Sequence, residues 1–541
     1  MSKGDGGLSK KLIGRLLKQS GKPLRISAVP RDHVEGDREA GELLLKGVLT
    51  WRGETMKLAN LDFADHSIER PIVRYLHSFA WLRDVAAATG REQGAKLGEA
   101  VARRWLARHG EKPDAAWAPA LLGERLLFLI AYAPFVLSTK DPDYRRVLLN
   151  VMARGARTLD ADADKATPGL ERITAWAGLT VASLTLSGNV PRIARGEAGL
   201  TRALAQGQYD DGGLMARRPW EQALLVDRLG LTRAAYFAAK QSLPDAVEEA
   251  TTAALAALHG VRHGDGGLSG WQGGNPGDPV HLNALVEGCG VRARPLREPR
   301  GWGYHRLSAL GTVVQIDAAP PPTGPYADAA HAGTLGIELS DGDQRIVMSC
   351  GGDGPSGRLA TSLAQALRGT AAHSTLVLED ADSSIIDTAG KLKTDIRDIH
   401  VARREKDGAS QIEAGHEGYA KRFGLAHRRT VKLSDTGKQI DGMDVLEPVG
   451  RRLRRPTRAF ALRFHLAPGI EVTPTADGLG ALLRCPAAPP WQFRCDGGTL
   501  AIEESLVVNG AGRPLKTQQL VIAGAAGKEG ANVHWHFRRS S

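Results

Sequence analysis

One histidine, His373, stands at the start of an apolar strand-like run, within the segment GTAAHSTLVLED of residues 369–380. An imidazole titrates near neutral pH, so it can accept or donate a proton during catalysis, or donate a hydrogen bond to a substrate carboxylate. A histidine at the start of a strand can equally be satisfied by a backbone carbonyl and serve the structure alone. We expect His373 to be the first candidate for chemistry, as a base or as a carboxylate-neutralising group.

Two turns earlier in the chain share one sequence. Asp-Gly-Gly-Leu occurs at residues 211–214 and again, 54 residues later, at 265–268. This offset is about the length of a helical hairpin with its loops, so the turns should lie at equivalent ends of successive hairpins. The alternative is ordinary turn chemistry, because glycine tolerates positive φ and aspartate caps the next helix.

The side chains beside these turns suit a sugar acid. Arginine binds a carboxylate through two N–H groups, and tryptophan presents a flat apolar face to a sugar ring. The predicted substrate-binding residues near the turns are Arg217, Arg218, Trp220, His263, Trp271 and Gln272, with Glu221 as a further acid–base candidate.

More tyrosine and histidine candidates stand beside glycines or strands in the later part of the chain. Tyr304 and His305 follow a Gly-Trp-Gly sequence at the first strand-like run. Tyr419 and His416 occupy a glycine-flanked loop, where an exposed phenol can act as base or acid; packing of the tyrosine on its own hairpin is the alternative. His427 either contacts substrate or lies on an exposed strand edge, and we favour the edge.

The hydrophobic period changes along the chain. Over residues 70–260 apolar side chains recur every three or four positions, as at Ile72, Tyr75, Phe79 and Leu82, which predicts amphipathic helices. Beyond about residue 300 short strand-like runs alternate with turn residues. These runs cover residues 312–317, 335–339, 345–349, 375–378, 430–433 and 501–507. Helices followed by strands predict two domains of different class.

The order of these signals resembles that of the heparinase II/III-like polysaccharide lyases. Besides the two Asp-Gly-Gly turns, the matching segments are 303–307 (GYHRL), 331–333 (HAG), 372–375 (AHST), 415–419 (GHEGY) and 427–429 (HRR). The resemblance implies an α+β multidomain fold, with an incomplete amino-terminal α/α toroid followed by a carboxy-terminal antiparallel β-sandwich. We expect a basic amino-terminal segment over 1–69, the toroid over 70–295 and the sandwich over 296–541, with an acidic polysaccharide in a cleft between the two domains.

The resemblance also implies β-elimination at a uronic acid. A base removes the C5 proton, an acid protonates the departing O4, and hydrogen-bond donors neutralise the carboxylate. His373 matches the histidine of the family's Ala-His-Asn-Thr-like motif. On this basis the catalytic candidates are His373, Tyr419, Tyr304 and Glu221, and the substrate-binding set gains His305, His416 and His427.

One segment departs from the family pattern. Family members carry a tyrosine in a Ser-Pro-x-Tyr-His-like segment after the first Asp-Gly turn, whereas residues 218–222 read RPWEQ. Two hypotheses follow: a lyase in which the β half and Glu221 carry the chemistry, or a non-catalytic protein that binds an acidic polysaccharide or assists cell-envelope assembly. Zinc supports some relatives, but residue 375 is threonine, although Asp380 and His400 lie downstream. We expect no cofactor, with a structural divalent metal as the alternative that the residues do not support.

A formal net charge of +11 over 541 residues favours an acidic partner. No zinc-finger, RNP or basic-zipper pattern specifies nucleic acid, and the arginine cluster at 451–458 is expected to be a solvated loop. The four cysteines show no CxxC spacing and are expected to be reduced core residues, with pairing of Cys485 and Cys495 across a hairpin as the alternative.

The amino-terminal residues are basic without an apolar run of signal-peptide length, and the longest apolar run, 126–137, is too short to cross a bilayer. We therefore predict a soluble protein, cytoplasmic by the absence of a signal peptide, with the periplasm or cell envelope as the alternative. A third hypothesis is association of the Leu/Lys segment 1–24 with an anionic surface.

Overall fold

A computed structural model describes residues 24–59, 61, 63, 68–111, 113–187, 192–450 and 456–540. The chain forms two compact units, each drawn from several stretches. Unit 1 comprises the described residues of 1–209, 223–255 and 283–292, and unit 2 those of 210–222, 256–282 and 293–541. Except for its last residue, the predicted surface-binding segment 1–24 lies outside the described residues, as do the cluster arginines 451, 452, 454 and 455.

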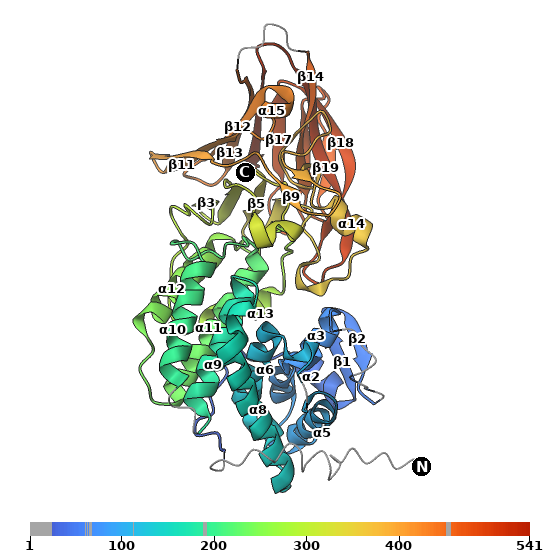
Figure 1. Ribbon diagram of the computed structural model, residues 1–541. Helices are drawn as coiled ribbons and strands as arrows, with labels where there is room; N and C mark the ends of the chain where they lie inside the picture. Colours follow the sequence, from blue (N-terminus) through green and yellow to red (C-terminus); the bar gives the residue numbers. More distant parts are fainter. Residues whose placement is uncertain are drawn as a thin grey trace. The chain divides into compact units, whose positions relative to one another are not determined.

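Unit 1 is mainly helical, as Figure 1 shows. Its helices are α2 (Arg38–Leu45), α3 (Pro71–Ser78), α4 (Leu82–Ala88), α5 (Arg91–His109), α6 (Pro119–Ala131), α7 (Ala133–Val136), α8 (Pro142–Asp162), α9 (Leu170–Thr185) and α10 (Ile193–Gly207). The division between the units falls within α11 (Pro219–Ala238), α12 (Asp245–Gly260) and α13 (Pro279–Gly288). The described part of unit 1 also contains a hairpin of β1 (Val48–Trp51) with β2 (Glu54–Lys57).

Local sequence explains how these helices begin and pack. The Asp141 carboxylate accepts the N–H groups of Asp143 and Tyr144 at the start of α8, where Pro142 is tolerated because that position needs no N–H. Helices α6 and α9 approach closely, since a Cβ atom on Gly178 would lie 2.4 Å from the Cα of Gly123. Only glycine fits at this crossing.

Unit 2 contains two large antiparallel sheets. The first has the order β10-β11-β12-β13-β20-β17-β16-β15, and the second the order β18-β19-β14-β6-β5-β4-β3, with β7 paired to β14. The strands of the first sheet are β10 (His400–Lys406), β11 (Ala409–His416), β12 (Leu425–Leu433), β13 (Gln439–Pro448), β15 (Glu471–Pro474), β16 (Gly480–Arg484), β17 (Trp491–Asp496) and β20 (Ala531–Arg539). Those of the second are β3 (Tyr304–Ala309), β4 (Thr312–Asp317), β5 (Ile337–Asp341), β6 (Gln344–Met348), β7 (Leu376–Leu378), β14 (Arg458–Leu466), β18 (Thr499–Val508) and β19 (Pro514–Ala526). A small hairpin pairs β8 (Ile385–Ile386) with β9 (Leu392–Lys393), and the short helices are α14 (Thr361–Ala366) and α15 (Ala420–Phe423).

Aromatic side chains join the inner faces of the two sheets. Phe464 of the second sheet packs against Phe493, Trp535 and Phe537 of the first, with ring centroids 4.9–5.6 Å apart. Strands such as β13 alternate buried and half-buried residues along their length, as expected when one face is in the core. By contrast, β4, β5 and β6 are buried at every position, because residues 261–270 cover their other face with the polar contacts described below.

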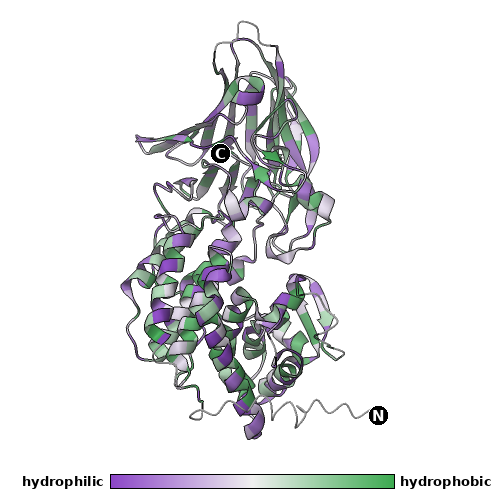
Figure 2. Ribbon diagram, viewed as in Figure 1, coloured by the Kyte–Doolittle hydropathy of each residue, from purple (hydrophilic) through white to green (hydrophobic). Residues whose placement is uncertain are grey.

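The coarse prediction of helices followed by an antiparallel sheet region is confirmed. All six predicted strand-like runs overlap observed strands, namely β4, β5, β6, β7, β12 and β18. Figure 2 shows hydrophilic and hydrophobic residues interleaved along both helices and strands. Among the described residues, every helix is either too short or too polar to pass through a membrane.

Candidate functional site

His373 follows a short 3-10 turn, Thr370–Ala372, and stands just before β7. Its side chain is buried, and Nδ1 lies 3.2 Å from the Oγ atom of Ser349. Burial, with a smaller contribution from His465, lowers the pKa of His373 to about 3. The imidazole is therefore neutral at neutral pH, and the ring nitrogen without a hydrogen can accept a hydrogen bond.

A second histidine, His331, faces the first. The two ring centroids are 5.4 Å apart, and the rings are nearly perpendicular. The backbone N–H of His331 donates to Oε1 of Gln272 at 2.8 Å, which ties this histidine to a predicted substrate-binding residue. Nδ1 of His331 and Nε2 of His373 have no hydrogen-bond partner among the described residues. We refer to His331 and His373 as the histidine pair.

Two more buried polar atoms near the pair lack a partner within the described part of the chain: Nε1 of Trp271 and Oγ1 of Thr334. A Cβ atom on Gly336 would lie 3.9 Å from the Trp271 Nε1 atom and 3.7 Å from the Cβ of His373, so both residues lie near this glycine. Buried polar atoms are almost always hydrogen-bonded in proteins. A group of unpartnered donors and acceptors is therefore a candidate ligand site.

Two arginines act on His331. Burial lowers the pKa of His331 well below its usual range, and His373, Arg368 and Arg218 lower it further. The Arg368 guanidinium is itself fixed, because it donates to the carbonyl oxygen of Ala330 at 3.0 Å. Neutral imidazoles beside cationic guanidinium groups favour an anionic ligand.

Arg217, expected to bind a substrate carboxylate, binds one inside the protein. Its fully buried guanidinium pairs with Asp317 and donates to the carbonyl oxygen atoms of Trp302 and Pro320 at 3.0 and 2.8 Å. The Tyr304 hydroxyl in turn donates to the Arg217 carbonyl oxygen at 2.6 Å. Both side chains join the first Asp-Gly-Gly turn to β3 and β4, and their roles towards substrate stay predictions.

The neighbours of Tyr304 are also internal. Trp271 stacks on the Tyr304 ring with centroids 4.5 Å apart. His305 is buried, and burial, together with Arg403 and Arg217, lowers the pKa of His305 to about 4. These aromatic groups are packed inside the protein and do not form an open sugar platform.

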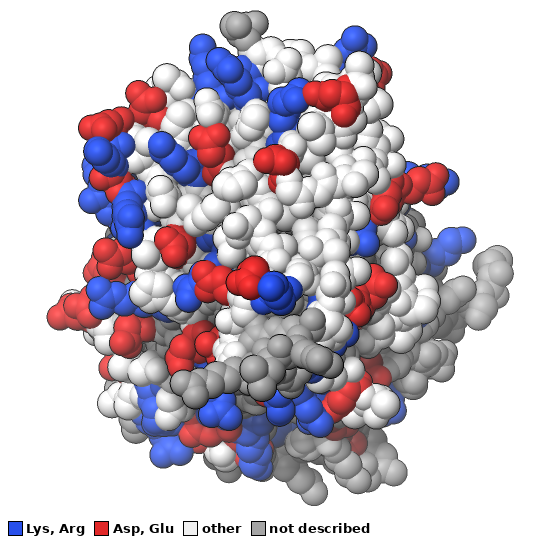
Figure 3. Space-filling model, turned by 90° about the horizontal axis from the view of Figure 1, so that it is seen from above, with Lys and Arg blue, Asp and Glu red and all other residues white. Residues whose placement is uncertain are grey.

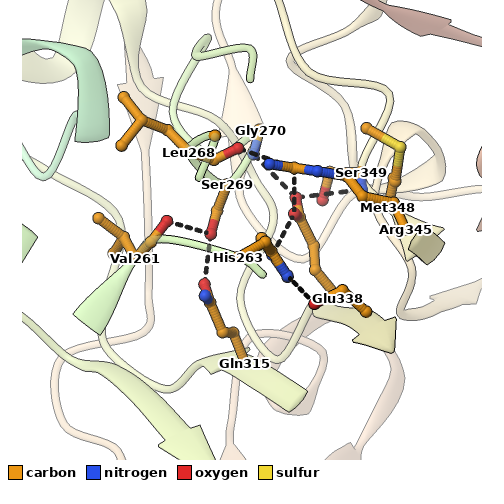
Figure 4. Close-up of polar contacts among 12 residues, drawn as sticks. Val261, His263, Leu268, Ser269, Gly270, Gln315, Glu338, Arg345, Met348 and Ser349 are labelled. Atoms are coloured by element: carbon orange, nitrogen blue, oxygen red, sulfur yellow. Dashed lines mark hydrogen bonds and ion pairs between the residues drawn. The ribbon is translucent and has the colours of Figure 1, made fainter. Parts of the chain in front are cut away.

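A polar network anchors the second Asp-Gly-Gly turn, and Figure 4 shows how it is arranged around Glu338. His263, predicted to bind substrate, is buried; its Nε2 atom lies 3.1 Å from Oε2 of Glu338 and its Nδ1 atom 2.9 Å from Oγ of Ser340. Burial and the nearby Arg345 lower the pKa of His263, so its single N–H donates to the carboxylate. The role of His263 towards substrate also stays a prediction.

The aspartates of the repeated turns have comparable structural roles. Asp211 accepts the backbone N–H groups of Gly301 and Trp302, both at 2.8 Å. Asp265 accepts two hydrogen bonds from Arg345, at 2.7 and 3.0 Å. The first turn is thereby attached to the segment just before β3, and the second turn to β6.

The exposure expected for Tyr419, His416 and His427 is wrong. Register pairs His416 with His427 on the core side of β11 and β12, where strand alternation buries both. The Tyr419 hydroxyl donates to the carbonyl oxygen of Leu376 at 2.9 Å, as expected for a tyrosine that packs on the fold. The His427 Nε2 atom lies 2.6 Å from Oδ1 of Asp444.

Asp444 is the centre of this buried network. It accepts hydrogen bonds from Nε of Arg429 at 2.8 Å and Nε1 of Trp535 at 2.7 Å. Burial raises the pKa of Asp444, but Arg429 and His427 outweigh that effect, and the pKa falls to about 2. Arg429 also donates to the carbonyl oxygen of Ser374, so the network reaches the residue after His373.

Three predicted site residues lie together after the first turn, on residues 218–221. Nη1 of Arg218 lies 2.6 Å from Oε1 of Glu221, and both side chains keep slight exposure. Trp220 is half-buried beside Gly354, where an added Cβ would lie 3.9 Å from its ring. Of the residues predicted around the turns, Arg218 and Trp220 are the two that are not buried.

Residues 291–536 match the family described as "Heparinase II/III-like, C-terminal". The chain carries a heparinase II/III-like C-terminal domain. It is 27% identical over 543 residues to "FtsZ-localized protein C" of Caulobacter vibrioides (strain NA1000 / CB15N), covering 96% of this chain and 91% of the relative. Its fold is similar to a crystal structure of heparinase III (TM-score 0.69, 13% identity, 98% and 88% of the two chains) and to heparan sulfate lyase HepC from Pedobacter heparinus (0.60, 16%, 93% and 82%).

The histidine pair lies within the heparinase II/III-like domain, whereas Trp271 precedes it. Sequence reasoning noticed the segment around His331 but did not assign that residue a role. It also missed Ser349 and Glu338, for which the sequence carries no local motif; each acquires its place through contacts between strands and loops distant in sequence.

No set of three or more His, Cys, Asp or Glu side chains converges as metal ligands anywhere in the described ranges. Asp380 and His400, two possible metal ligands downstream of the predicted strand, are exposed.

Proposed function

We propose that this protein is a polysaccharide lyase that cleaves an acidic, uronate-containing polysaccharide by β-elimination, with His373 accepting the C5 proton. The observation that carries the proposal is a neutral His373 whose Nε2 atom has no partner among the described residues, while Ser349 holds Nδ1. If Nδ1 carries the hydrogen and donates to Ser349, the Nε2 lone pair would take the proton, and the negative charge of a bound uronate would raise the lowered pKa of His373 towards the range of a general base.

The neighbours of His373 supply the second requirement of this reaction. A uronate C5 proton becomes acidic enough only when donors offset the charge of the adjacent carboxylate. The indole N–H of Trp271 is unpartnered within the described residues. We propose that it binds that carboxylate, with Arg218 contributing at longer range.

The proposal includes an incomplete α/α toroid in the helical part, the division into 1–69, 70–295 and 296–541, and a reaction without metal or other cofactor. It names an acidic polysaccharide as partner, without specific nucleic acid. It also keeps the cytoplasm as the compartment, with the periplasm or cell envelope as alternative.

The second candidate is a protein that binds an acidic polysaccharide, or assists cell-envelope assembly, without cleavage. The observation that favours it is the engagement of both predicted phenols: Tyr304 and Tyr419 donate to backbone carbonyl oxygens, and Trp220 stands where relatives carry a tyrosine. An elimination without a phenol lacks its usual acid. The relative named for its localization with FtsZ also favours a role in assembly.

Surface charge is compatible with either candidate. Figure 3 shows acidic and basic side chains intermingled on one face, around a broad area that carries neither. The net charge of +11 is therefore not concentrated in a single basic patch on that face.

An ultraviolet assay for the conjugated double bond of an unsaturated uronate tests the lyase directly. Purified protein is incubated with a panel of acidic polysaccharides, alongside His373→Ala and, as a matched control, His400→Ala, which replaces an exposed histidine of the same unit. New absorbance that disappears only in the His373 variant supports elimination. Calorimetric binding without absorbance supports the second candidate. If the protein shows neither absorbance nor binding, both candidate functions are refuted.

A further inference from the structure

Glu338 is a fully buried carboxylate on β5 that touches two different parts of the candidate site. Its Oε1 atom accepts the backbone N–H of Gly270 at 2.8 Å and that of Ser349 at 3.3 Å. Figure 4 shows the glutamate among these partners, with His263 on its other oxygen. One oxygen atom therefore bridges a loop and the end of a strand.

Each of these backbone groups belongs to a segment that carries a site residue. Gly270 directly precedes Trp271, whose indole nitrogen is unpartnered among the described residues. Ser349 carries the hydroxyl that contacts Nδ1 of His373. The distance between indole and imidazole thus depends on two backbone segments that share a single acceptor.

We propose that Glu338 is a positioning residue: it holds the Trp271 loop and Ser349 in register, and through Ser349 it orients His373. This inference rests on the proposed function of the histidine pair. It assigns Glu338 no contact with substrate and no proton transfer.

The surroundings of Glu338 explain why a carboxylate is needed. Three N–H donors converge on its two oxygens, from Gly270, Ser349 and His263. Nη1 of Arg345 lies 3.7 Å from Oε2 and supplies positive charge. A glutamine of the same shape would turn an NH₂ group towards at least one of these donors, so one hydrogen bond would be replaced by a donor–donor contact.

The test compares Glu338→Gln and Ser349→Ala with wild-type full-length protein labelled with ¹⁵N in its histidines. The matched control is Glu504→Gln, an exposed glutamate on β18. The ring nitrogen signals of His373, assigned by their loss in His373→Ala, report which nitrogen carries the hydrogen and how it is bonded. We expect both test variants to shift these signals, while the control leaves them unchanged and the exposed His400 signals stay constant in all variants.

Unchanged His373 signals in folded Glu338→Gln overturn the proposal, because a residue with only a structural role would lower stability without altering that ring. If Glu338→Gln does not fold, Ser349→Ala decides: unchanged signals there overturn it equally. Where the wild type cleaves polysaccharide, Glu338→Gln should lower kcat about 10-fold or more with little change in KM. If the wild-type protein shows no turnover, the proposed lyase function is refuted. The His373 ring signals still test the positioning role of Glu338.

Discussion

Replacing Asp444 with asparagine should loosen the first sheet of unit 2 by an amount that the structure sets. Asparagine keeps the shape but removes the charge opposite the fully buried Arg429, and its NH₂ group meets donors from His427, Arg429 or Trp535. Removing one partner of a buried ion pair costs about 3–5 kcal/mol, because the remaining charge is uncompensated.

The pKa of Asp444 supplies an independent and lower value for the free energy of folding that Asp444→Asn loses. A fall from the usual 3.8 to about 2 corresponds to roughly 2 kcal/mol in favour of the ionised carboxylate. Neutral asparagine resembles the protonated acid, so the expected loss lies between about 2 and 5 kcal/mol. Because the folded pKa is lowered, the contribution is complete above about pH 4 and disappears as the pH falls towards 2.

Hydrogen exchange measured by mass spectrometry reads this loss locally, which suits a protein with two units. A loss of 2 kcal/mol accelerates exchange about 30-fold in peptides from β12, β13 and β20. Asp441→Asn, on the same strand but half-exposed, is the matched control and should change exchange little. Acceleration below about threefold in Asp444→Asn, or equal acceleration in both variants, would refute the reasoning.

Three further outcomes are expected. Gly213→Ala should cost about 1–3 kcal/mol in thermal unfolding, because its Cβ would lie 2.4 Å from the Trp302 ring, whereas Gly260→Ala, with open space around its Cβ, should not destabilise. Tyr419→Phe should cost about 1 kcal/mol and leave polysaccharide turnover or binding unchanged; turnover lost at full stability would instead place the phenol in the chemistry. Burial raises the pKa of the Cys350 thiol to about 12, so iodoacetamide at pH 8 should modify it only after denaturation, as peptide mapping would detect.

The helical class of the first half and the β class of the second could be predicted from the sequence, because the spacing of apolar residues reflects which face of a helix or strand is buried. Strands β14 and β20 were not predicted, although Phe460, Leu462 and Phe464 alternate on one, and Trp535 and Phe537 on the other. The signal was present there. The full burial of β5 and β6 was not readable, because it depends on a loop more than 60 residues earlier.

Residue types in the candidate site were easier to predict than their surroundings. Sequence reasoning singled out His373, and the structure adds His331 as its neighbour. It also expected Arg217 to be available for a substrate carboxylate, but Asp317, one hundred residues away, provides an internal one. A local pattern cannot reveal a distant partner, so the chemistry of a side chain was inferred more securely than its availability.

The position of β20 has a consequence for how the protein is made. This strand pairs with β13 on one side and β17 on the other, and every other strand of its sheet comes earlier in the chain. Until residues 531–539 emerge from the ribosome, β10–β13 and β15–β17 remain two ribbons with open edges that can recruit other chains. Synthesis that stops before residue 531 therefore removes more than one strand: it leaves a sheet divided in two and prone to aggregate.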